Sequence, residues 1–182
     1  DGAVQLDSTL TVGVNDTGYD VKLFGATSGK YALWDESADS WIISGTQSTV
    51  TAGTSNYIAG VDAGNSIESG GNYNVVVGDG AGTAITTGDN NTFIGTSSGD
   101  ATTTSNSNTA VGSQSLTANT TGAGNVGMGM GALAANTTAS FNTAVGYGSL
   151  DANTTGASNV ALGSNALGVN TTAANNVAIG TN

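Results

Sequence analysis

The sequence predicts an all-β fold: a parallel β-solenoid (β-roll) of 17-residue coils with a small amino-terminal β module. Three observations predict it: a motif that returns at a constant interval, 29 glycines with no proline, and a charged fraction of only 8%. Soluble domains ordinarily have roughly 25% charged residues and roughly 7% glycine. An ordinary compact domain is therefore not expected.

The repeat is an asparagine followed by a short apolar stretch and a glycine. Its copies begin at Asn74, Asn91, Asn108, Asn125, Asn142, Asn159 and Asn176, each seventeen positions after the one before. A more divergent copy begins at Asn56, eighteen positions before Asn74. Seventeen residues are too few for a helix pair or a propeller blade. They suit one coil of a solenoid in which equivalent residues stack about 4.8 Å apart.

Each unit is predicted to contain two short β segments and two turns. The first segment ends in a glycine, at Gly95, Gly112, Gly129, Gly146, Gly163 and Gly180. A glycine fixed there indicates a positive φ or a close approach of two chain segments. The second segment is expected at Ser115–Leu116, Ala132–Leu133, Ser149–Leu150 and Ala166–Leu167. It leads into an Asn-Thr-Thr sequence that is typical of a turn.

Stacking of identical units explains the unusual composition. Asparagine and threonine side chains placed one above another can hydrogen-bond along the axis as ladders. A charged side chain would repel its own copies in the same stack. Residues 101–182 accordingly carry a single charge, Asp151.

The first segment also predicts self-association. Its two central residues are both apolar, as in Ala110–Val111 and Ala178–Ile179, and neighbouring strand residues point to opposite faces. The core of each coil is expected to be thin: one branched aliphatic and one leucine, padded with alanine. We therefore expect a homotrimer in which the outward strip packs on its copies. The alternative is a monomer with a mildly apolar outer stripe.

The amino-terminal part has a different residue pattern, in which apolar residues alternate with polar ones. It contains both tryptophans, Trp34 and Trp41, which we expect in its core. Strands are expected at 4–14, Tyr19–Phe24, Lys30–Trp34 and Ser40–Ser44. Such a module would cap or join the solenoid, whose open end exposes strand edges. The expected organisation is a β module at 1–45, a transition at 46–55 and the repeats at 56–182.

Charge excludes several classes of function. The net charge is −11, from 13 acidic and 2 basic residues, so the chain cannot coat a phosphate backbone or an anionic membrane. No apolar run reaches the roughly 18 residues that suggest membrane insertion. Without histidine or cysteine there is no triad-type nucleophile and no zinc site. We expect no enzyme activity and no cofactor.

Acidic residues are weak candidate sites. Three lie close together and resemble an acid pair or a cation site, although a solvated hairpin turn is the favoured reading: Asp35, Glu36 and Asp39. Four others lie in glycine-rich loops, where oxygen ligands could hold Ca²⁺: Asp62, Asp79, Asp89 and Asp100. No EF-hand spacing is present, so ordinary surface aspartates are favoured there.

Aromatic residues give a different kind of candidate. Phe141 and Tyr147 occupy repeat positions that vary between units, so we expect them to be exposed and name them as candidate glycan contacts. Phe93 replaces an alanine of the motif and is expected inside its coil.

The units of the form NTAVG…SL..NTTG..N resemble the head repeats of trimeric autotransporter adhesins of the YadA type. They are more similar still to longer repeats common in bacteriophage tail-fibre and related surface proteins. The stretch Asp16–Ile43 resembles a module that recurs in structural proteins of marine phages. The period of 17 departs from the shorter adhesin repeat, and no coiled-coil stalk or membrane anchor is seen.

The resemblance implies a structural and adhesive fibre shaft of a phage virion, or a bacterial adhesin head, in a virion or at a cell surface. Its implied partners are its own copies, other fibre or virion proteins, and a host surface glycan. Two further alternatives come from the residues. A tailspike-type depolymerase would need carboxylates facing a groove, and an ice-binding solenoid would use stacked threonines.

Overall fold

The computed structural model describes residues 21–24, 31–35, 40–44 and 52–181. The chain divides into two compact units, Asp1–Gln47 and Ser48–Asn182. In the first unit, three antiparallel strands form a sheet of order β1-β2-β3: β1 (Val21–Phe24), β2 (Tyr31–Asp35) and β3 (Ser40–Ser44). The register pairs Trp34 with Trp41. The strand expected at 4–14 and the tryptophan side chains lie outside the described part.

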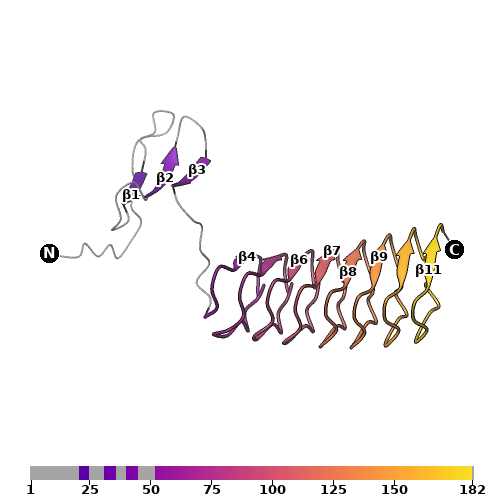
Figure 1. Ribbon diagram of the computed structural model, residues 1–182. Coiled ribbons are helices and arrows are strands. Elements are labelled where there is room, and N and C mark those ends of the chain that lie inside the picture. Colours follow the sequence, from indigo (N-terminus) through magenta and orange to yellow (C-terminus); the bar gives the residue numbers. More distant parts are fainter. Residues whose placement is uncertain (1–20, 25–30, 36–39, 45–51, 182) are drawn as a thin grey trace. The chain divides into compact units, whose positions relative to one another are not determined.

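The second unit is a parallel β-solenoid, in which each coil contributes one strand to an eight-stranded sheet (Figure 1). The strands are β4 (Tyr57–Ala59), β5 (Val75–Val77), β6 (Thr92–Ile94), β7 (Thr109–Val111), β8 (Val126–Met128), β9 (Thr143–Val145), β10 (Val160–Leu162) and β11 (Val177–Ile179). Neighbouring strands pair at the interval of the repeat, as Ala110 does with Gly127. The pairing of β4 with β5 spans one residue more, as Tyr57 with Val75. The structure thus confirms the predicted solenoid, with about seven turns.

The predicted second β segment is wrong. Ser115–Leu116 and its equivalents form turns, and Leu116, Leu133 and Leu150 have φ values of 53°, 55° and 51°. A residue in the left-handed region cannot continue a strand. Hydrogen bonds between coils nevertheless continue through the turn, since the Leu116 N–H donates to the Ala132 carbonyl at 3.0 Å. Each coil therefore has one three-residue strand.

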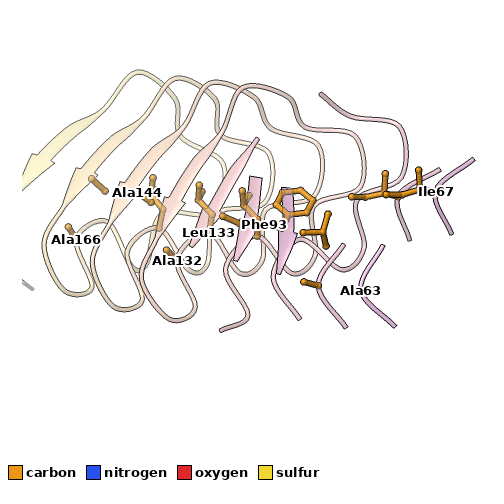
Figure 2. Packing of buried hydrophobic residues seen from close by; sticks show 14 residues of the cluster. Ala63, Ile67, Phe93, Ala132, Leu133, Ala144 and Ala166 are labelled. Atoms are coloured by element: carbon orange, nitrogen blue, oxygen red, sulfur yellow. The ribbon is translucent and has the colours of Figure 1, made fainter. Parts of the chain in front are cut away.

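The core lies inside the coils, and both strands and turns contribute to it, as Ala144 on β9 and Leu133 in a turn do (Figure 2). Counting the motif asparagine as position 1, position 3 points inward: Ala110, Ala144 and Ala161 are fully buried. Position 4 points outward, so the branched aliphatic that was expected in the core is not there. Val111 is half-buried and Ile179 is 75% exposed. Leucine at position 9 supplies most of the interior volume in the later coils.

The first three coils fill the interior from other positions. Where later coils have leucine at position 9 they have Gly64, Gly82 and Gly99. A Cβ added to Gly99 would lie 2.5 Å from the ring of Phe93, which is fully buried as predicted. The core is thus kept full by exchanging volume between positions.

The glycine that ends each strand meets both conditions that the sequence indicated. Gly112 and Gly129 have φ values of 128° and 133°, a region almost confined to glycine. A Cβ on Gly129 would also lie 2.6 Å from the carbonyl carbon of Gly146 in the next coil. A side chain there would push adjacent coils apart.

Candidate functional site

The motif asparagines form one column that runs the length of the solenoid. The backbone N–H of each donates to the Oδ1 of the asparagine in the preceding coil, and Asn91 does so to Asn74 at 2.9 Å. The Asn91 Nδ2 donates both to Asn74 Oδ1 and to the Ser105 carbonyl, at 3.1 and 2.9 Å. These buried amides have their hydrogen-bonding capacity satisfied by one another and by the backbone. The column therefore holds the coils together.

A second asparagine column, at position 12, begins the Asn-Thr-Thr sequence that was predicted to form a turn. The structure buries Asn119, Asn136 and Asn153 completely. The Asn136 Nδ2 donates to Asn119 Oδ1 at 3.0 Å, and the pattern continues through Asn170. Next to it runs a threonine column, in which the Thr120 Oγ1 donates to the Thr137 carbonyl at 3.1 Å. The amide side chain, repeated at the interval of the coil, was the signal that could have indicated burial.

The acidic candidates of the solenoid are spread over three coils, and three of them accept hydrogen bonds from a neighbouring coil. Asp79 Oδ1 accepts the Val61 N–H at 3.0 Å, and Asp89 Oδ1 accepts the Asn72 N–H at 2.7 Å. Asp62 Oδ1 accepts a longer bond from Asn65 within its own loop, and Asp100 accepts one from Thr117 of the next coil. Among the described residues no three metal-binding side chains gather. Glu36 and Asp39 lie outside the described residues.

The outward face of the eight-stranded sheet carries an apolar row, which we call the outer strip. Its position-4 residues are Val77, Ile94, Val111, Met128, Val145, Leu162 and Ile179. Ile94, Met128 and Leu162 are 39%, 43% and 45% exposed. A continuous exposed apolar row of this kind is typical of an interaction site. Within residues 52–181 no helix is long and apolar enough to cross a membrane.

No family model, curated protein or solved structure matches this chain. The solenoid contributes no positive side chain, because both lysines, Lys22 and Lys30, precede it in a sequence without arginine or histidine. Its surface field is negative or neutral throughout, which disfavours anionic ligands.

The two candidate aromatics flank the same strand. Phe141 precedes β9 and is 69% exposed, while Tyr147 follows β9 and is 57% exposed. The Phe141 ring lies above Gly124, where an added Cβ would be 2.9 Å from it. Tyr147 instead lines a surface hollow of about 160 Å³ together with Met130 and Asp151. The structure thus separates the two residues into different surroundings.

Proposed function

We propose that this chain is a structural and adhesive segment of a phage fibre shaft, which self-associates as a homotrimer through the outer strip. The observation that carries the proposal is the position of the branched aliphatics. They point away from a coil that already has its own buried core of alanine and leucine. A monomer would leave the outer strip in water over seven strands.

Copies of the same chain are the partner that best fits this surface. The outer strip repeats once per coil, about every 4.8 Å, so an identical chain offers an apolar row of equal period. Apolar side chains of one copy can then meet those of another at every coil. Closed symmetry with a small number of subunits is also the usual form of soluble assemblies. The resemblance of the repeats to trimeric surface-fibre proteins favours three.

The hydrogen-bonded columns suit the role of a spacer. From β4 to β11 the axis advances seven steps of about 4.8 Å, roughly 34 Å. Two asparagine columns and one threonine column connect successive coils throughout the later part. Bending or stretching the solenoid would break these bonds together. A shaft of this kind keeps a binding surface at a constant distance from its base.

A bacterial adhesin head is the alternative with the same architecture, and labelling separates the two. An antibody against residues 52–181 is expected to mark fibres on phage particles that carry the gene for this chain, as seen by electron microscopy. Labelling of the bacterial surface without phage would favour the adhesin head. Absence of label from both would overturn the proposal.

An exposed threonine column makes ice binding a second candidate. Its members, at position 14 of six successive coils, are Thr87, Thr104, Thr121, Thr138, Thr155 and Thr172. They lie in bends and not on the sheet, so the surface they form is a single row. An assay of ice recrystallisation tests this candidate.

A depolymerase is less favoured, since Asp79, Asp89 and Asp100 accept hydrogen bonds from other coils.

A further inference from the structure

Residues that depart from the repeat and are not required by the fold are candidates for a binding role. Position 6 holds serine or threonine in four coils, yet Met130 and Tyr147 occupy it in two neighbouring coils. Position 10 carries Asp151, the only charged residue among residues 101–182. The fold requires none of these three side chains, because other coils adopt the same conformation without them. All three line one hollow.

The hollow exists because two glycines follow one another in the position-7 column. Gly131 and Gly148 form its floor, and a Cβ added to Gly131 would meet nothing within 4 Å. The same column holds the amide side chain of Gln114 in the preceding coil, which also lines the hollow. Tyr147 and Met130, 57% and 50% exposed, supply its apolar surface. The result is a small concave site with a π face, an amide and one carboxylate.

This set of groups matches a single neutral sugar. The C–H face of a pyranose can lie on the negative π face of Tyr147, and its hydroxyls can donate to Asp151 or accept from Gln114. Ligand pockets likewise place a few polar groups beside apolar surface, and here the two kinds of surface are about equal. The volume of about 160 Å³ is below the roughly 300 Å³ at which drug-sized pockets begin, so one ring is the appropriate size. The negative charge of the chain disfavours uronic and sialic acids.

We propose that the hollow formed by Tyr147, Met130, Gln114 and Asp151 over Gly131 and Gly148 binds one neutral hexose unit of a surface glycan. The inference rests on the adhesive part of the proposed function and gives it a ligand class. Soluble sugar binding and chain mass are measured separately. If no sugar binds, the proposal of a trimeric shaft is unaffected. If the chain has the mass of a monomer, the proposal of a sugar site is unaffected.

The test is a titration of the full chain with methyl glycosides of glucose, mannose and galactose, in which saturation-transfer NMR measures binding. At least one is expected to bind with a dissociation constant of roughly 1–10 mM, as suits a single exposed ring. Tyr147→Ser installs the residue found at position 6 of the adjacent coil and removes the π face. It is expected to weaken binding about tenfold. Tyr73→Ser removes another exposed tyrosine, at a repeat position where Ser107 and Ser158 adopt the same left-handed φ, and is the matched control that leaves binding unchanged.

Filling the hollow gives an independent variant. Gly131→Asn places a side chain in a column where Asn165 already adopts a φ of 55°, so the fold is retained and binding is expected to be lost. Gly80→Asn, at the same position of another coil, leaves binding unchanged. The proposal is overturned if no neutral glycoside binds up to about 50 mM, or if binding survives both Tyr147→Ser and Gly131→Asn. Binding of tetramethylammonium alone, lost in Asp151→Asn, would identify a cation site and overturn it equally.

Discussion

Asn125 and Asn136 donate their side-chain N–H groups to the same acceptor, the carbonyl of Ala139, at 2.9 and 3.0 Å. Asn125 belongs to the first asparagine column and Asn136 to the second. Both residues are fully buried, and Ala139 is 4% exposed. The carbonyls of Gly156 and Ala173 make the same double contact in the next two coils. The two columns are therefore linked across the interior of the solenoid in three successive coils.

Removing one amide from the first column should destabilise the solenoid. Asn125→Ala deprives the Asn142 N–H of its acceptor and Asn108 Oδ1 of one of its donors. Buried groups left without a partner cost about 1–3 kcal/mol each, so the free energy of unfolding should fall by roughly 2–4 kcal/mol. Guanidinium unfolding followed by circular dichroism measures it.

The matched control for this variant is Asn65→Ala. Asn65 is exposed, and its side-chain hydrogen bonds, to Asp62 and Ser66, stay within its own loop. Its unfolding midpoint should stay close to that of the wild type. Equal midpoints for the Asn125 and Asn65 variants would contradict the structural role of the column.

The strand-ending glycine should not tolerate a methyl group. Gly129→Ala forces a non-glycine residue to a φ of 133° and brings its Cβ to 2.5 Å from the Gly146 carbonyl oxygen. We expect loss of the folded solenoid, visible as lost β signal in circular dichroism. Gly131→Ala, two residues away and facing open space, should cost only about 1–2 kcal/mol for its left-handed φ. Comparable stability of the two variants would refute the close approach of adjacent coils.

The core leucine offers a test of the interior. Leu133 is fully buried, and Leu133→Ala should lower the free energy of unfolding by about 2–5 kcal/mol through the cavity that it leaves. Val169→Ala, at a residue 84% exposed, is the control and should change it by less than about 0.5 kcal/mol. The same guanidinium series compares the two. A Leu133 variant as stable as the Val169 variant would place Leu133 outside the core.

The sequence was sufficient to predict the fold because stacking imposes a period that is visible in the residues. Asn91 to Asn176 recur at one interval, and the parallel pairing of coils follows from it. The conformation of Leu116 was missed because leucine in a β-like pair gives no sign of a positive φ. Position 9 has the same left-handed φ in the first three coils, where it is glycine, so the path of the backbone imposes it and these glycines were the signal in the sequence.

The candidate sites were less predictable for a related reason. Tyr147 was predicted as a site residue because it departs from the repeat, but Gln114 and Met130 were missed. Met130 lies one coil and Gln114 two coils before Tyr147, so the three residues meet at one hollow only when the coils stack. Registering every unit on its asparagine would have brought position 6 and position 7 of neighbouring coils together. The floor made by Gly131 and Gly148 could not be predicted, because the sequence does not indicate which side of the chain each glycine faces.

Charge in the outer strip should dissociate the assembly without unfolding the coil. Val145 points outward from β9, so Val145→Lys leaves the interior unchanged while each copy brings an unpaired cation into an apolar contact. The particle mass should fall to that of the 17.6 kDa chain, with an unaltered circular dichroism spectrum. Thr155→Lys, in the exposed threonine column, should keep the assembled mass. If Val145→Lys also kept it, the outer strip would not be the interface.

The mass of the full chain in solution tests most directly whether this solenoid is one subunit of a self-associated shaft. Native mass spectrometry, supported by sedimentation equilibrium at micromolar concentration, should give three times the mass of the 17.6 kDa chain. A predominant mass equal to one chain, with the coil folded by circular dichroism, would contradict the account.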